Sequence, residues 1–280
     1  HVVLTRKALA HAAINRLWKE VPVLNLHLDE RVGATAFENV ARPAQSADCD
    51  EANDRCPGAG VDGWIYGAAR FDGTNDALQV ASHAPLDLDK FTIGLWVYPT
   101  QRKSINQKLL TRENWLGEIQ NYALSIEPDS MTIRYEDCRQ SFDSSPDALL
   151  EDQWNHVMVT HDADALTLYV NGAEDSVLTN TVAPCQFGTL YLGGDYATYW
   201  GTADAEPFAG SLDEVTIYGR AFSRPEVEDL YNYQVSWYDI SDEHRITVDA
   251  EKPTATIVLT STAVDMSPGR VIEILAQDET

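Results

Sequence analysis

Three oxygen-bearing side chains fall within one short segment of the sequence. Asp72, Asn75 and Asp76 surround Gly73, so that carboxylate and amide oxygens gather within a single turn. Calcium takes about six to eight oxygen ligands from such side chains, from main-chain carbonyls and from water. The segment therefore predicts a Ca²⁺ site. The alternative is an Asx turn, in which the same side chains bind backbone N–H groups and no metal.

A second group of side chains combines aromatic rings with amide and carboxylate groups. Residues 195–201 read DYATYWG, and further aromatic residues follow polar ones at 113–115 and 121–122. Flat rings beside hydrogen-bonding groups suit sugars, which need both apolar stacking and hydrogen bonds. The candidate ligand-binding residues are Trp115, Tyr122, Tyr196, Tyr199 and Trp200. The alternative is that Tyr199 and Trp200 pack over the edge of the fold as a lid.

Four cysteines are present, and their spacing argues against zinc because there is no C-x-x-C pair. An even number in an acidic, strand-rich chain favours disulfides and an oxidising compartment, although four buried free thiols are the alternative. Three pairings can be drawn. Cys49 and Cys56 bracket a short polar loop, and Cys138 and Cys185 each end a strand-like run, so we expect these two pairs. Disulfides and an oxidising compartment in turn predict an extracellular or cell-surface protein.

Catalytic motifs are not found in the sequence. It contains no E-x-D-x-x-E strand, G-x-S-x-G elbow, H-E-x-x-H helix or phosphate-binding Walker loop. Glu214 follows Asp213, but successive residues of a strand point to opposite faces. The histidines are scattered and are read as half-buried strand residues: His27, His83, His156 and His161. We therefore assign no catalytic residue and predict that the chain is not an enzyme.

The charge balance narrows the range of partners. Lys and Arg total 20 against 44 Asp and Glu, a net charge of −24. Such a chain repels the phosphates of nucleic acid and attracts cations. No run approaches the ~18 apolar residues of a membrane span. The first residue is His and no signal peptide is recognisable, which indicates a processed product or a piece of a longer protein.

Most of the chain alternates between apolar and polar residues with the period of a β-strand. Turn signals such as Asn171-Gly172 separate the strands, so the pattern predicts an all-β, antiparallel sandwich. Trp96 and Trp154 are expected to fill the core or the space between its sheets rather than to serve as ligand platforms. One helix is expected at 223–231, with a capping box formed by Ser223 and Glu226. The expected strands are 23–28, 77–82, 91–97, 108–112, 122–126, 131–136, 154–161, 166–171, 189–192 and 214–218.

Composition divides the chain into four parts. Residues 1–21 are rich in alanine, with Leu9, Ala13 and Leu17 at helical spacing, and are expected to form a helix or linker. Residues 22–234 form the β domain, and 235–252 are a polar linker. Residues 253–280 alternate like two strands, which cannot bury a face alone. They are expected to begin another β domain whose open edges could be completed by a neighbouring chain.

Four motifs in order carry a resemblance to a known family. They are FDGTND at 71–76, FTIGLWV at 91–97, WNHV at 154–157 with LYVNG at 168–172, and FAGSLDEVTIYGRAFS at 208–223. The β domain resembles the laminin G-like, concanavalin A-like jelly-roll modules of large secreted bacterial proteins. The resemblance implies that Asp213 joins Asp72, Asn75 and Asp76 around the calcium ion. It also makes residues 253–280 similar to the start of an immunoglobulin-like domain.

Three functions compete. The first is an extracellular, non-catalytic module that binds a glycan or a surface protein for adhesion, since loops on a rigid sandwich carry recognition. The second is a structural link in a surface filament, assembled by strand addition. The third, more remote, is a glycoside hydrolase, because the resemblance includes such enzymes and they need two carboxylates across a cleft.

Overall fold

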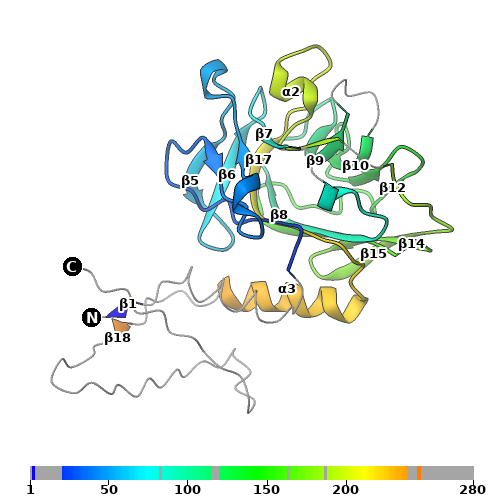
Figure 1. The fold of residues 1–280 in the computed structure, drawn as a ribbon. Helices are drawn as coiled ribbons and strands as arrows, with labels where there is room; N and C mark the ends of the chain where they lie inside the picture. Colours follow the sequence, from blue (N-terminus) through cyan, green and yellow to red (C-terminus); the bar gives the residue numbers. More distant parts are fainter. Residues whose placement is uncertain are drawn as a thin grey trace. The chain divides into compact units, whose positions relative to one another are not determined.

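The computed structural model describes residues 2–3, 21–81, 84–114, 120–162, 164–185, 188–238 and 245–246 of the 280. Residues 21–231 form one compact unit. In it two antiparallel sheets pack face to face, which confirms the all-β sandwich (Figure 1). Among the described residues, none of the helices has the length and apolar character of a membrane-spanning segment.

The first sheet has eight strands in the order β12-β11-β10-β9-β16-β7-β4-β3. Neighbours that are distant in sequence lie side by side, as in β9 beside β16, which is the crossover pattern of a jelly roll. The bounds are β3 Ala36–Phe37, β4 Ala47–Asp48, β7 Leu78–Val80, β9 Gln107–Glu113, β10 Gln120–Ile126, β11 Ile133–Glu136, β12 Ser141–Asp143 and β16 Thr189–Leu192.

The second sheet runs β15-β14-β13-β8-β17-β6-β5, and β2 also pairs with β17. Its strands are β2 Leu24–Leu26, β5 Gly58–Asp62, β6 Gly67–Asp72, β8 Phe91–Pro99, β13 Asn155–His161, β14 Ala165–Val170, β15 Ala173–Thr179 and β17 Ala209–Tyr218. The short helices of this unit are η1 Pro43–Gln45, η2 Glu51–Asn53, η3 Ala84–Leu86 and α2 Tyr196–Trp200.

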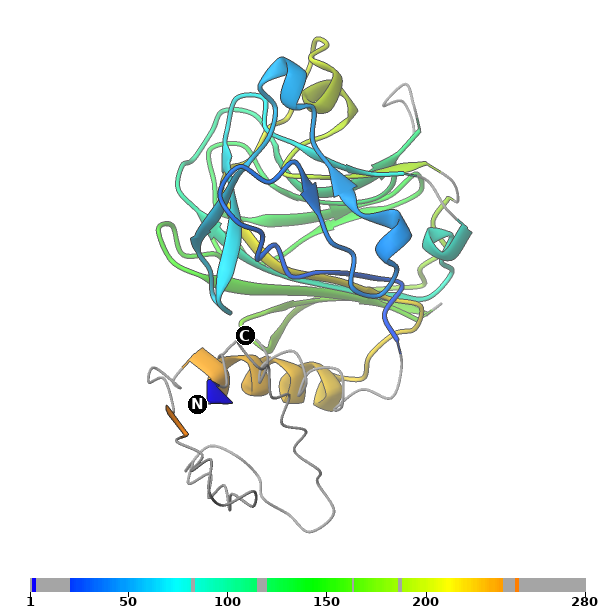
Figure 2. The same cartoon turned by 60° about the vertical axis from the view of Figure 1, so that its left-hand side comes forward.

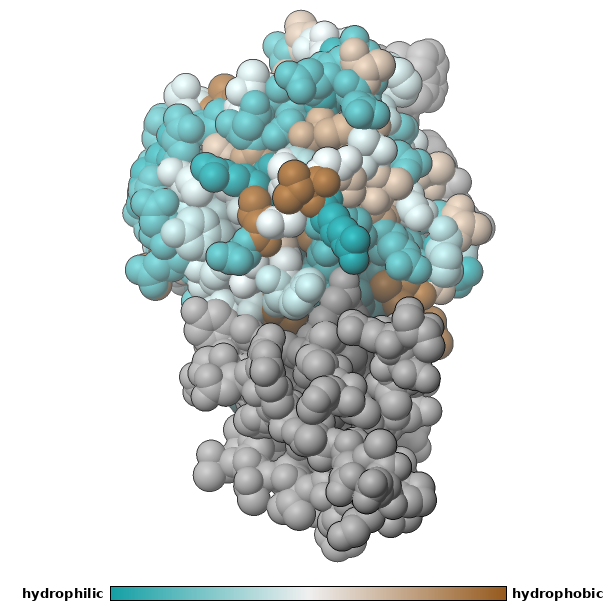
Figure 3. All heavy atoms as spheres, turned by 90° about the vertical axis from the view of Figure 1, so that its left-hand side faces the viewer, coloured by the Kyte–Doolittle hydropathy of each residue, from teal (hydrophilic) through white to brown (hydrophobic). Residues whose placement is uncertain are grey.

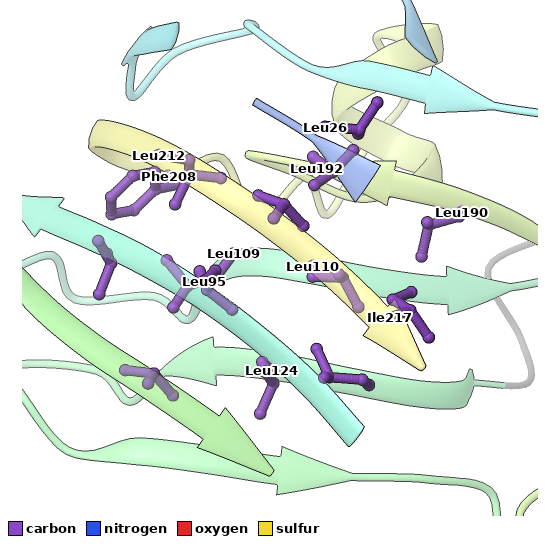
Figure 4. Close-up of a cluster of buried hydrophobic side chains, with 14 of the residues drawn as sticks. Leu26, Leu95, Leu109, Leu110, Leu124, Leu190, Leu192, Phe208, Leu212 and Ile217 are labelled. Atoms are coloured by element: carbon purple, nitrogen blue, oxygen red, sulfur yellow. The ribbon is translucent and has the colours of Figure 1, made fainter. Parts of the chain in front are cut away.

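The core lies between the two sheets. Leu95 of β8 and Leu212 of β17 face Leu110 of β9 and Leu124 of β10 across the gap (Figure 4). Each of these side chains is at most 1% exposed. Because fully burying a leucine contributes roughly 1.5–3 kcal/mol, this cluster supplies the main stabilisation of the scaffold.

Trp96 is buried as predicted, whereas Trp154 is only partly buried. Trp96 lies on the outer face of β8, where it stacks on Trp64 with ring centroids 4.0 Å apart. Core and outer residues alternate along a strand, and the core positions of β8 belong to its neighbours such as Leu95. Trp154 is half-buried and meets the edge of Tyr98 at 5.6 Å. Neither tryptophan fills the space between the sheets.

The turn at Asn171 and Gly172 is confirmed. Both residues have positive φ, 51° and 77°, and they connect Val170 to its partner Ala173. A side chain at Gly172 would collide with the ring of Tyr231 in α3, Arg224–Tyr238. Glycine is therefore required both by the turn and by the helix that packs on it.

Helix α3 begins as the sequence predicts, but it continues beyond residue 231. The backbone N–H of Ser223 donates to the Glu226 carboxylate at 2.7 Å, which forms part of the expected capping box. Arg220 also binds this carboxylate, at 2.8 Å. The Arg220 hydrogen bond is the main reason that the pKa of Glu226 falls to about 2.

Both expected disulfides form. Cys49 pairs with Cys56 across 7 residues, and Cys138 pairs with Cys185 across 47. The first closes the loop that contains η2, and the second connects the loop after β11 to the segment before β16. The pairing predicted from the sequence is confirmed.

The remaining predictions lie mostly outside the described residues. In the second unit, residues 1–20 and 232–280, β1 Val2–Val3 pairs antiparallel with β18 Arg245–Ile246. The immunoglobulin-like segment at 253–280, and strand addition through it, lie outside the described residues. So do nearly all of the N-terminal helix or linker and of the 235–252 linker beyond α3.

Candidate functional site

The segment 195–201 is a short helix rather than a loop. Asp195 caps α2, because its carboxylate accepts the backbone N–H of Thr198 at 2.8 Å. Gly201 ends the helix with φ 67°, the left-handed conformation that favours glycine. The sequence contains the usual capping residues of a helix, because an Asp precedes this short segment and a Gly follows it.

Helix α2 and the neighbouring strand β16 form a layer of aromatic rings, which we call the aromatic platform: Tyr191 of β16 and Tyr196, Tyr199 and Trp200 of α2. The rings contact one another, with centroids 5.8 Å apart for Tyr191 and Tyr199 and 5.3 Å for Tyr199 and Trp200. Tyr191 and Tyr199 are buried, whereas Trp200 is 49% exposed. The platform thus has a buried base and one ring open to solvent. Of the predicted ligand-binding residues, the structure brings together Tyr196, Tyr199 and Trp200.

The aromatic platform is braced by the loop that the Cys49–Cys56 disulfide closes. Arg55 of that loop donates to the main-chain oxygen of Tyr199 at 2.7 Å and pairs with Asp50 at 3.4 Å. In Figure 2, η2 and α2 lie side by side at the top of the sandwich. Arg55 fills the space above Gly201, where a Cβ would meet the guanidinium. The disulfide loop and the platform therefore form one surface.

Glu113 of β9 anchors the start of α2. Its carboxylate accepts the backbone N–H of Tyr196 in a short hydrogen bond, and the residue is 2% exposed. Burial raises the pKa of Glu113 to about 7, and the nearby Asp195 carboxylate adds to this effect. The anchor of the platform therefore changes its charge near neutral pH.

Glu113→Gln is expected to remove a pH dependence of stability. The folded-state pKa, about 7, lies above the ordinary 4.5, so the contribution of Glu113 is full below about pH 4.5 and is lost as the pH rises through 7. Glutamine keeps the acceptor and cannot ionise. Urea unfolding at several pH values should show wild type losing up to about 3 kcal/mol relative to the variant as the pH rises. Parallel curves would contradict this, and Glu38→Gln, at an exposed position, is the control.

One predicted ligand-binding residue, Tyr122, does not belong to the platform. Tyr122 is 1% exposed and lies in the core, 5.7 Å from the ring of Phe91. It occupies an inward position of β10, between outward Asn121 and Ala123, so the prediction for Tyr122 is wrong. Trp115 lies outside the described residues. The missed member of the platform is Tyr191, whose outward position on β16 could have been inferred from its alternation with Leu190 and Leu192.

The acidic turn between β6 and β7 forms the Asx arrangement. Asp72 accepts the N–H groups of Thr74 and Asn75, at 2.7 and 3.3 Å. Asp76 accepts the N–H of Asp72 at 2.8 Å. Burial raises the pKa of Asp76 to about 6. The carboxylates of the turn are thus used in backbone hydrogen bonds.

Asp213 lies away from this turn. On β17, the residue opposite Asp72 is Ala209, and Asp213 lies four residues further along, or about 13 Å at the usual rise of a strand. Its carboxylate accepts the N–H of Ile65 at 2.8 Å. In the described part of the chain, no group of three or more His, Cys, Asp or Glu side chains is arranged to hold a metal. Asp72, Asn75 and Asp76 share the turn, but Asp213, the fourth residue of the predicted calcium site, is not brought to it.

A lysine ammonium already occupies the oxygen-rich position beside the turn. The Lys103 Nζ donates to the main-chain oxygens of Gly73 and Pro207, at 2.7 and 2.9 Å. These carbonyls are the kind of ligand that calcium would share with Asp72. The residues at this turn therefore do not fit a calcium ion, because a positive group of the protein itself binds the carbonyls.

Lys103→Met is expected to lower the free energy of unfolding by about 1–3 kcal/mol, since two carbonyls lose a charged donor. Thermal or urea unfolding measures this, with the exposed Lys90→Met as control. A turn that held calcium would behave differently. Its lysine variant would unfold like wild type, and EDTA would lower the midpoint of the wild type.

A bulge in β17 changes the faces of its acidic residues. Glu214 has φ 51°, and the pairing with β8 shifts between Asp213 and Thr216. The extra residue means that Asp213 no longer shares a face with Val215 and Ile217, as a regular strand would require. Asp213 therefore points away from the core between the sheets. The bulge is difficult to predict from the sequence, because residues other than glycine are uncommon at positive φ and a glutamate gives no indication of it.

The same bulge brings Asp213 and Glu214 into one buried cluster with His27. The Glu214 carboxylate lies 2.8 Å from His27 Nδ1. Burial, followed by the charge of Glu214, raises the pKa of Asp213 well above its usual range. The expectation that the two carboxylates lie apart was wrong, but Asp213 and Glu214 are 0% and 2% exposed. They do not face solvent as the acid and base of a hydrolase must.

Comparison with solved structures supports the sandwich. The binding domain of Paraclostridial Mosquitocidal Protein 1 is similar over 76% of this chain and 52% of its own, with 18% identity and TM-score 0.56. A Trypanosoma rangeli sialidase covers 75% of this chain and 32% of its own, with 16% identity and TM-score 0.55. The CBM40 of a Ruminococcus gnavus sialidase, bound to α2,3-sialyllactose, is similar over 59% of this chain and 96% of its own, with 20% identity and TM-score 0.50.

At these identities the likeness shows the fold alone. The chain spans about half of the mosquitocidal binding domain and a third of the sialidase. A search of curated protein sequences found no match. The family model of the concanavalin A-like lectin/glucanases superfamily, Laminin_G_3, matches residues 72–228, which is more than half of the chain. This match and the observed two-sheet sandwich agree, and the chain belongs to the concanavalin A-like lectin/glucanases superfamily.

Proposed function

We propose that this chain is a non-catalytic carbohydrate-binding module and that the aromatic platform is its contact surface. The observation that carries the proposal is Trp200, whose ring is 49% exposed while the aromatic rings beneath it are buried. An exposed tryptophan held by other rings offers a flat apolar face to a sugar. Its position is fixed before any ligand arrives.

The rigidity of the platform favours binding. Tyr196 and Tyr199 contact Trp200 with centroids 6.2 and 5.3 Å away, and Arg55 ties α2 to a loop closed by a disulfide. A side chain that is ordered in the free protein loses little conformational entropy when a ligand binds. The polar groups of the disulfide loop, Asn53 and Asp54 among them, are exposed beside it and can bind sugar hydroxyls.

Similar structures are consistent with recognition. The structural neighbours include a toxin binding domain, a botulinum neurotoxin receptor-binding domain and a CBM40 bound to sialyllactose. These ligands belong to those proteins. They support the class of function proposed here, since loops on a rigid scaffold commonly carry recognition.

A hydrolytic function is less well supported. Glycoside hydrolases place two carboxylates about 5–10 Å apart across an open cleft. The one acidic pair that the β17 bulge creates, Asp213 and Glu214, is buried. His156 is also buried, which lowers its pKa to about 3 and keeps the ring neutral. The proposal therefore assigns no catalytic group.

The proposal places the module outside the cell. Two disulfides persist in an oxidising environment, and the net charge of −24 maintains solubility there. No calcium ion is part of the proposed function, because Lys103 binds the carbonyls beside the acidic turn.

The test is binding of the full chain to a panel of immobilised glycans. We expect at least one glycan to bind, and excess soluble glycan to compete with it. A panel that covers neutral, amino and acidic sugars and shows no binding would overturn the proposal. Binding that persists unchanged when Trp200 is truncated would place the site elsewhere.

A further inference from the structure

The aromatic platform lies among negative charges. Asp48, Glu51 and Asp54 of the neighbouring segment are exposed, and Asp50 is partly exposed. Burial raises the pKa of Tyr199, and the charges of Asp50 and Asp48 add to this effect. Burial also raises the pKa of Asp76 in the adjoining turn, with a smaller contribution from Asp54. The upper end of the molecule, where η2 and α2 lie, is mostly hydrophilic (Figure 3).

Two basic side chains, Arg55 beside the platform and Lys103 at the neighbouring acidic turn, are already engaged. Arg55 is held by the Tyr199 carbonyl and by Asp50, with its side chain 17% exposed. Lys103 is held by two main-chain carbonyls. An acidic sugar is recognised through charged donors that can reach its carboxylate. At this surface both groups would have to give up their present partners first.

We infer that the aromatic platform selects sugars by charge: it binds a glycan that carries free amino groups in preference to a neutral one, and it rejects a glycan that carries a carboxylate. The inference rests on the proposed function, since it names the ligand class of the same site. It differs from what the likeness to a sialyllactose-bound domain would suggest.

Two physical effects act in the same direction. An ammonium group near the face of an exposed tryptophan is attracted by the negative face of the ring. The surrounding carboxylates attract the same group through water, each by an amount that corresponds to about two- to threefold in affinity at 8 Å. A carboxylate on the ligand is repelled by both, so the discrimination between the two charges is larger than either effect alone.

The test compares two matched pairs of ligands by titration calorimetry on the full chain. The first pair is chitotriose with free amino groups and its N-acetylated form, and the second is lactose and 3′-sialyllactose. We expect the free amine to bind at least about threefold tighter than its N-acetylated form. We expect sialyllactose to bind more weakly than lactose. The preference should shrink as salt rises toward 1 M, where the Debye length is about 3 Å.

A charge variant gives the control. Asp54 has φ 55°, a conformation that asparagine also tolerates, so Asp54→Asn removes the charge and keeps the turn. It should reduce the preference for the amine about twofold. Asp164→Asn, in the exposed turn after β13 at the other end of its sheet, should leave the preference unchanged.

The outcomes separate the two proposals. Tighter binding of sialyllactose than of lactose, abolished by Trp200→Ala, would overturn the charge inference and leave the platform as a glycan site. Equal affinities within each pair would overturn it in the same way. Binding of none of the four ligands would overturn the proposed function and the inference together.

Discussion

Trp200→Ala is expected to weaken glycan binding at least tenfold, which corresponds to about 1.4 kcal/mol or more. The ring is the exposed member of the aromatic platform and would provide most of the apolar contact with a sugar face. Because nearly half of its surface is already in water, truncation should disturb the fold little. Calorimetric titration of wild type and variant with the same glycan measures the loss.

Trp200→Phe is the matched control, because it keeps a flat ring on the same neighbours, Tyr196 and Tyr199. It should retain most of the affinity that alanine loses. Thermal unfolding of both variants should remain within a few degrees of wild type. Full affinity in the alanine variant would show that the platform is not the contact surface.

Removal of the Cys138–Cys185 disulfide is expected to have the largest effect on stability. The bridge closes a loop of 47 residues, and in the chain-entropy account a loop of this length contributes about 4 kcal/mol at 25 °C. The Cys49–Cys56 bridge, with a separation of 7, should contribute about 2.5 kcal/mol on the same basis. Urea unfolding of the two double serine variants measures both losses.

The informative result is which disulfide variant loses more free energy of unfolding. A larger loss from the short loop would mean that native contacts around η2, such as the Arg55 hydrogen bond to Tyr199, outweigh the constraint on the unfolded chain. Equal losses would show that loop length does not govern the effect in this protein.

The strands were predictable where one face is buried. Phe91, Ile93, Leu95 and Val97 alternate with outward residues, and all four belong to the core of β8. The period fixes both the strand and its inner face, since a slip of one residue would expose every apolar side chain. The disulfide pairs were also predictable, because one loop can close locally and the other two cysteines remain.

Three features of the candidate sites were missed: a bulge in one strand, the inward position of one tyrosine and a contact between distant segments. The bulge at Glu214 brings Asp213 to the same face as Glu214, and no glycine or asparagine marks it. Tyr122 was assigned to the site by its type and its neighbour, although its alternation with Leu124 places it in the core. The ammonium of Lys103 at the acidic turn depends on a contact between segments far apart in sequence, which spacing cannot reveal.

An NMR titration of the isotope-labelled full chain with a glycan that binds would show directly whether the aromatic platform is the contact surface. We expect the indole N–H of Trp200 and the backbone amides of α2 and of the loop between Cys49 and Cys56 to shift together and saturate together. Shifts confined to the opposite end of the sandwich, with the Trp200 signal unchanged, would contradict this expectation.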